Sequence, residues 1–253
     1  MDTTRAVAGP MAARRRRTGS ARAATAAGLA GLLLGLLGGA AVTAAAGASA
    51  SSQLTQAKQQ LLVKSDLPSG WTAQGSVTTS GGGGKTSFPG GNELATCIGV
   101  SPRLITLNTP EATSPTFQTA GSVDSVQDQV SVFSSAKVGA QQYTAISGPK
   151  VPGCLTEVLA GPAGQQLTQS FGSGVTVGTI SVTPAKRAML IPHSSGFTMA
   201  FPVTTKGISL TATVTVISFV RGTFGTQVTL TTAGLPFPAA LAHHLVAVAS
   251  SRG

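Results

Sequence analysis

The last third of the chain contains four stretches rich in Val, Ile, Thr and Phe, and these constrain the fold more than any other feature. Such residues favour the pleated surface of a β-sheet. The third and fourth stretches are separated only by Arg221 and Gly222, which predicts a β-hairpin and therefore antiparallel pairing. The four predicted strands cover residues 175–182, 197–203, 208–220 and 223–232.

Helical and strand periodicities alternate in the rest of the chain. Alternating Val126, Asp128, Val130 and Val132 predict a strand over 125–133, and another strand is predicted over 71–78. Helices are predicted over residues 53–63, 93–99, 101–107, 136–146, 154–159 and 238–250. This order predicts an α+β fold in which helices flank a largely antiparallel sheet, as a single domain over residues 51–253.

A basic and then apolar leader precedes this domain. Arginines fill positions 14–17, residues 23–50 carry no charge, and residues 29–37 are the most apolar part. Ala48-Ser49-Ala50 forms an A-x-A cleavage pattern, so residues 1–22 and 23–50 resemble the parts of a secretory signal peptide. The alternative is an uncleaved transmembrane anchor. Both interpretations place residues 51–253 outside the cytoplasm, secreted or at the cell surface.

The basic net charge does not indicate nucleic-acid binding. Six of the 17 Lys and Arg residues lie in the first fifty positions, and the others are scattered singly. Nucleic-acid-binding proteins cluster these residues on one face or in runs. Ser and Thr make up about a quarter of residues 51–253, which favours β-structure. We therefore expect no nucleic-acid partner, and contact with a membrane only through the N-terminal segment.

The two cysteines, Cys97 and Cys154, predict a structural disulfide, because an exported chain folds under oxidising conditions. The alternative, a pair of free thiols that bind a ligand or act as nucleophiles, is less common outside the cytosol.

The segment 80–92 contains SGGGGKTS, which ends like a phosphate-binding loop. That motif requires an earlier glycine where this chain has Thr79, and a helix directly after the lysine. Pro89, Gly90 and Gly91 follow instead. We interpret the segment as a flexible surface loop.

Few residues suggest catalysis or metal binding. Asp124 and Asp128 are the only close pair of acids in the exported part, and we interpret them as exposed charges at a strand edge. His243 and His244 are neighbours that diverge on a helix, while His193 follows a proline. We predict no catalytic, cofactor-binding or metal-binding residues. Trp71, Arg103 and Arg221 are the candidate ligand contacts, although Trp71 also suits a core position and both arginines suit a solvated surface.

Several segments together resemble a group of actinobacterial envelope proteins. They are LLVKSDLPSGW at 61–71, VSVFSSA at 130–136, the two cysteines, the hairpin at Arg221-Gly222 and the C-terminal helix. In order and spacing they are similar to the extracellular sensor domains of PknH-type serine/threonine kinases and to LpqN-like secreted proteins and lipoproteins. The resemblance implies an antiparallel sheet flanked by helices, a ligand-binding cleft and no catalytic activity. The kinase sensors hold two disulfides where this chain can form one.

These observations predict an exported, non-enzymatic, sensor-like domain of the bacterial cell envelope. It would bind a small or apolar ligand, or another envelope protein, and would need no cofactor. The alternatives are a structural or adhesion protein of the envelope and a secreted hydrolase with a non-standard site.

Overall fold

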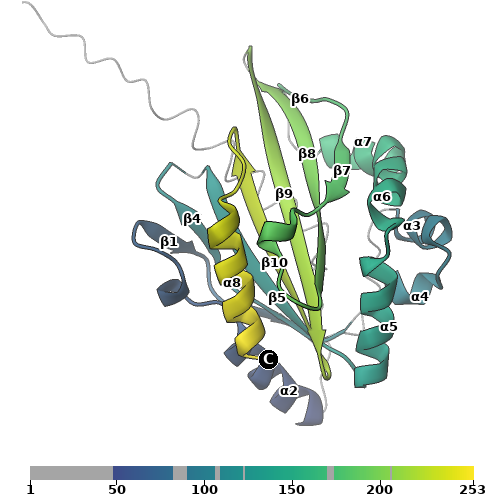
Figure 1. The fold of residues 1–253 in the computed structure, drawn as a ribbon, viewed down its shortest axis with the longest axis vertical. Helices are drawn as coiled ribbons and strands as arrows, with labels where there is room; N and C mark the ends of the chain where they lie inside the picture. The colour runs from purple at the N-terminus through teal and green to yellow at the C-terminus, as the bar shows by residue number, and fades with distance from the viewer. Residues whose placement is uncertain (1–47, 82–89, 106–108, 122, 170–173, 206) are drawn as a thin grey trace, which may run out of the picture.

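A ten-stranded antiparallel sheet forms the centre of the protein (Figure 1). The computed structural model describes residues 48–81, 90–105, 109–121, 123–169, 174–205 and 207–253. The main path of the sheet runs β1-β4-β5-β10-β9-β8-β6, with β2 paired to β3, β3 to β5, and β7 to β8. Its strands are β1 (Trp71–Gln74), β2 (Thr78–Ser80), β3 (Glu111–Thr113), β4 (Thr116–Thr119), β5 (Asp124–Val132), β6 (Val175–Val177), β7 (Ser181–Pro184), β8 (Ser194–Thr205), β9 (Ile208–Arg221) and β10 (Phe224–Ala233).

Helices lie on both faces of this sheet. In Figure 1, α8 lies across one face with α2 below it, and α3 to α7 form a group on the other side. The helices are α2 (Ala48–Gln60), α3 (Gly91–Ile98), α4 (Pro102–Ile105), α5 (Ala136–Ser147), α6 (Val151–Ala160), α7 (Pro162–Gln169) and α8 (Ala239–Ser251), with short 3₁₀ turns η1 (Lys64–Asp66) and η2 (Arg187–Met189). The predicted α+β class and antiparallel sheet are confirmed.

Each face of the sheet has its own hydrophobic core. On the first face, α8 buries Leu245 and Val246 in a cluster with Ile217 and Leu230. Ala57 of α2 and Leu61, just after that helix, are buried with Val130 in a smaller adjoining cluster. On the second face, α6 packs against the apolar side of β7, β8 and β9. Burial of large aliphatic and aromatic side chains on both faces is the main stabilising contribution to such a layered fold.

Two strands predicted as continuous are each divided in the structure. The first prediction, over 71–78, ends early because Gly75 has a φ of 80°, so β1 and β2 are separate strands. The second, over 175–182, splits into β6 and β7 opposite Pro202. Proline supplies no N–H to the ladder, and there the Gly178 N–H donates to the Pro202 carbonyl at 2.7 Å. A bulged connection therefore joins the two short strands.

Helix α5 packs on the sheet with a different side from the one that its hydrophobic spacing predicts. The spacing of Ala140, Tyr143 and Ile146 predicts that these three residues share the buried side of the helix. In the structure Ala140 is exposed, whereas Gly139 is buried. A Cβ at Gly139 would lie 2.6 Å from the Phe133 ring, so the absent side chain permits this close packing.

The predicted leader lies mostly outside the described residues. Helix α2 begins the described chain at Ala48 and continues through the A-x-A site at Ala50. The glycine-rich segment is described only at its two ends, because residues 82–89 fall outside those ranges. Within the described ranges, no helix has both the length and the apolar character needed to span a bilayer.

Candidate binding face

The register of the sheet divides its second face into an apolar half and a polar half. Residues directly opposed on neighbouring strands point to the same side. Val214 and Val216 of β9, which contribute to the core under α6, are opposed by Thr231 and Thr229 of β10. Between Gln227 and Thr231 of β10, and on β5, β3 and β4 beyond it, this side carries hydroxyl and carboxamide groups and one carboxyl group, Glu111, instead of aliphatic ones.

We call these positions the polar half-sheet. All are Ser, Thr or Gln except one glutamate, and their common side follows from the pairing of β3, β4, β5 and β10. They are Glu111, Thr113, Thr116, Gln118, Ser125, Gln127, Gln129, Ser131, Gln227, Thr229 and Thr231.

Accessibility varies across the polar half-sheet, and Ser125 of β5 is 7% exposed, as buried as members that adjoin the apolar half. Thr229 and Thr231 are 3% and 7% exposed, whereas Gln127, Gln129 and Gln227 are half-buried. Helix α5 contacts β9 and β10, so the boundary lies beside the helical group of this face. The arrangement is a polar sheet surface with the helical group along one side.

Two carboxamides on this surface are held in place. The Gln127 Nε2 donates to the Ser114 carbonyl at 3.1 Å and to Thr116 Oγ1 at 3.2 Å. The Gln129 Nε2 donates to a carboxylate oxygen of Glu111. Burial raises the pKa of Glu111, and hydrogen bonds from Gln129 and Ser80 only partly oppose that effect. Both amide groups therefore have fixed orientations before any ligand arrives.

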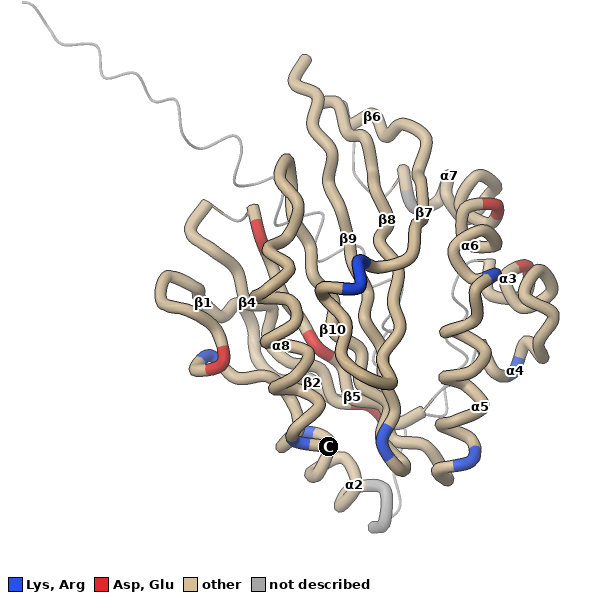
Figure 2. Tube along the Cα trace, in the orientation of Figure 1, with Lys and Arg blue, Asp and Glu red and all other residues tan. Residues whose placement is uncertain are grey.

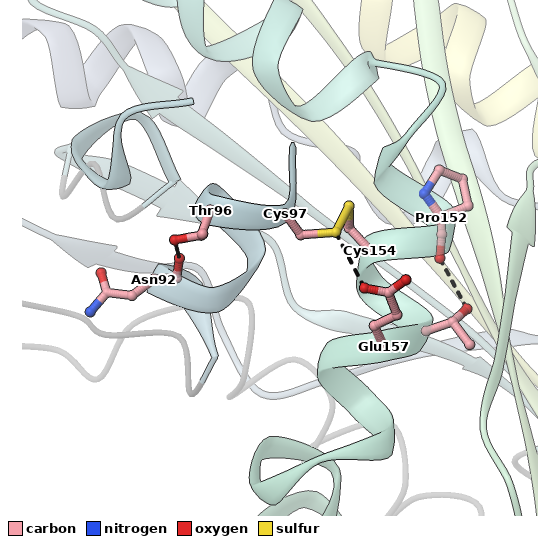
Figure 3. The surroundings of a disulfide bond; sticks show 7 residues. Asn92, Thr96, Cys97, Pro152, Cys154 and Glu157 are labelled. Carbon is pink, nitrogen blue, oxygen red and sulfur yellow. Dashed lines mark hydrogen bonds between the residues drawn. A yellow bond between two sulfur atoms is a disulfide. The ribbon is translucent and has the colours of Figure 1, made fainter. Parts of the chain in front are cut away.

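The predicted disulfide is present and joins two helices of the helical group. Cys97 on α3 and Cys154 on α6 are bonded at an S–S distance of 2.05 Å (Figure 3). Glu157, also on α6, places a carboxylate oxygen 3.5 Å from Cys97 Sγ. Because α3 is short, this covalent link to α6 holds it against the rest of the helical group.

The three candidate ligand contacts belong to separate parts of the fold. Trp71 is 5% exposed, and its ring centroid lies 6.3 Å from that of Phe237. Trp71 therefore occupies a core position, which was considered above as the alternative to contact with a ligand. Arg103 is exposed on α4, and Arg221 is exposed at the end of β9. None of the three belongs to the polar half-sheet. Their contact with a ligand stays a prediction.

The interpretation of Asp128 as an exposed charge was wrong. Its side chain is 1% exposed and faces the first side of the sheet, among Val126 and Val130. One carboxylate oxygen, Oδ2, accepts the Leu62 N–H at 3.1 Å. The other, Oδ1, accepts no hydrogen bond from the described residues. Desolvation raises the pKa of Asp128 to about 6, although the Ser114 hydroxyl, the Leu62 N–H and the Arg252 charge favour its ionised form.

Asp128 lies beneath the place where the two ends of the domain meet. Arg252, at the end of α8, donates to the Leu61 carbonyl at 2.5 Å and pairs with Asp66 at 2.6 Å. Asp66 in turn accepts the Val63 N–H at 2.7 Å. Asp128 and Arg252 therefore both bind the chain segment that follows α2. Together these residues form a structural network on the face of the sheet opposite the polar half-sheet.

The histidines do not assemble into a site in the described part of the chain. His243 and His244 are exposed on α8, and His193 has a φ of 62° just before β8, where its carbonyl accepts the Tyr143 hydroxyl at 3.0 Å. Among the described residues there is no group of three His, Cys, Asp or Glu side chains placed to hold a metal ion.

Comparison with known proteins gives little further information. No family model matches the chain, and no curated protein matches it. Among solved structures, the extracellular domain of PknH from Mycobacterium tuberculosis aligns with a TM-score of 0.35 and 10% identity, covering 78% of this chain and 96% of that one. It is one of the domains whose order of elements the sequence resembles, but a likeness this low carries no inference about function.

Proposed function

We propose that this chain is an exported, non-enzymatic, sensor-like domain that binds a component of the cell envelope through the polar half-sheet. The observation that supports the proposal most is the continuous run of Ser, Thr and Gln side chains across β3, β4, β5 and β10. A sheet face used only for solvation would not need carboxamides fixed by neighbouring groups, as Gln127 and Gln129 are.

Export is supported by the leader pattern together with the disulfide between Cys97 and Cys154. Disulfides persist in oxidising compartments and are rare in the cytosol. The disulfide also bears on binding, because it restrains the helical group that lies beside the polar half-sheet. A restrained helical group lowers the entropy cost of ligand capture.

Co-sedimentation with the envelope fraction of the producing cells tests this function. We expect the exported protein to sediment with that fraction, and the variant Gln118→Arg/Gln227→Arg to stay in the supernatant, since it places two bulky charges on the polar half-sheet. The control Gln56→Arg/Gln59→Arg makes the same charge change on exposed positions of α2 and should sediment like the wild type. Wild-type protein that remains soluble, or equal sedimentation of both variants, would contradict the proposal.

A further inference from the structure

We infer that the ligand of the polar half-sheet is an uncharged, hydroxyl-rich polymer, that is, a neutral polysaccharide. This inference rests on the proposed binding function and specifies its ligand class. It follows from the spacing, the charge and the residue types of the surface.

The spacing of the surface suits a repeating ligand. Gln127 and Gln129 lie two residues apart on β5, and Gln129 is opposed by Gln227 of β10, so half-buried carboxamides are repeated along one strand and across to the next. Neighbouring strands lie about 4.8 Å apart, and successive residues on one side of a strand are separated by roughly 7 Å. Hydroxyl and carboxamide groups both donate and accept hydrogen bonds, as sugar hydroxyls do. A chain of sugars can therefore meet the same kind of partner at each step.

The charge of the surface disfavours ionic ligands. Strands β3, β4, β5 and β10 contain no Lys or Arg, and Figure 2 shows the basic positions on helices and at the ends of elements. On these four strands a polyanion would find no cation to neutralise it. Among the described strand residues that face this side, the one carboxyl group is that of Glu111, which already accepts a hydrogen bond from the Gln129 amide. An uncharged ligand matches an uncharged surface.

The residue types disfavour a protein or lipid partner. Protein interfaces depend on buried aromatic or arginine anchors, and the polar half-sheet has neither. Lipid chains require apolar area, which on this face of the described sheet lies under α6. Because the polar half-sheet has no aromatic rings, sugars cannot stack on it, and each sugar unit contributes little binding free energy. A polymer would therefore bind through many repeated contacts.

The carboxamide groups of Gln127 and Gln129 present hydrogen-bond acceptors in fixed directions. The Gln127 Nε2 donates to Thr116 and to the Ser114 carbonyl, and the Gln129 Nε2 donates to Glu111. Within the described residues no donor reaches their Oε1 atoms, so two oriented acceptors remain for ligand hydroxyls. Since these groups are already ordered, binding loses little side-chain entropy at these two positions.

Affinity electrophoresis of the exported protein tests the inference, using gels that contain dextran, amylose, galactan or mannan, with polygalacturonate and heparin as charged comparators. We expect retardation by at least one neutral polymer and none by the charged ones. In Gln127→Ala/Gln227→Ala the apparent affinity should fall about tenfold, because two side chains that bond the ligand are lost. The matched control Gln56→Ala/Gln59→Ala should be retarded like the wild type.

Two results would overturn the inference. The first is unchanged mobility in all four neutral polymers. The second is envelope binding that disappears after protease treatment of the envelope and is unaffected by added neutral polysaccharide, which would indicate a protein partner. In either case, sedimentation that still depends on the polar half-sheet would leave the proposed binding function intact while removing its ligand class.

Discussion

Replacing both Cys97 and Cys154 with alanine is expected to lower the free energy of unfolding by about 4 kcal/mol. The disulfide closes a loop of 57 residues, and the chain-entropy model assigns roughly that stabilisation to a cross-link of this length. The loss should appear as a lower denaturation midpoint in guanidinium chloride, with little change in the dependence on denaturant.

The reductant dependence of the wild type provides the matched control. Oxidised wild-type protein should lose a similar free energy when a reductant is added, whereas the alanine variant should be indifferent to it. Hydrogen exchange should then accelerate first in α3, which is short and is held to α6 by this bond. Equal midpoints for the oxidised wild type and the alanine variant would show that the disulfide does not stabilise the domain.

The second large effect expected is a pH dependence that originates at Asp128. Its pKa is about 6 in the folded protein, against an ordinary value of 3.8. A carboxyl with a raised pKa contributes stability that is complete below pH 3.8 and is lost as the pH rises through about 6. The difference of about two pKa units corresponds to at most about 3 kcal/mol. Unfolding monitored by circular dichroism between pH 4 and pH 7 measures this slope.

The variant Asp128→Asn should flatten that pH dependence and be at least as stable as the wild type at pH 7. The amide oxygen of asparagine can still accept the Leu62 N–H, and no charge has to be buried. The control Asp124→Asn, at a half-buried position of the same strand, should keep the wild-type slope. The pKa of Glu111 is also raised, so Glu111 lowers stability in the same direction as the pH rises. Part of the pH dependence of stability should therefore remain in Asp128→Asn until Glu111→Gln is added. An unchanged slope in Asp128→Asn would contradict the assignment.

Much of the fold could be predicted because its strongest signals are local. The hairpin at Gly222, the alternating valines of β5 and the helix that became α8 all depend on neighbouring residues. The disulfide needed only the cysteine count and an oxidising compartment. By contrast, β3 and β4 are three and four residues long and lie beside Pro110 and Pro115, so neither carried a periodic pattern of useful length.

The candidate face could not be predicted, because it depends on the pairing of distant strands. Gln127, Gln129 and Gln227 each occupy an ordinary polar position of an alternating strand, and only the register of β5 with β10 places them side by side. Asp128 is different, since its signal was available. Asp128 is two residues from Val126 and from Val130, so its side chain points to the same face of the sheet as theirs. The alternation that predicted the strand therefore also placed Asp128 on the apolar side.

The central claim is that this domain matures outside the cytoplasm, where its disulfide forms and its polar half-sheet meets the envelope. Intact mass of the protein recovered from the medium and from the envelope, measured without reductant, tests it most directly. We predict the oxidised form, two hydrogen atoms lighter than the dithiol, beginning at Ser51 if the leader is cleaved or retaining the leader in the membrane fraction. Recovery of the full-length chain from the cytosol with Cys97 and Cys154 both as titratable thiols would contradict the account.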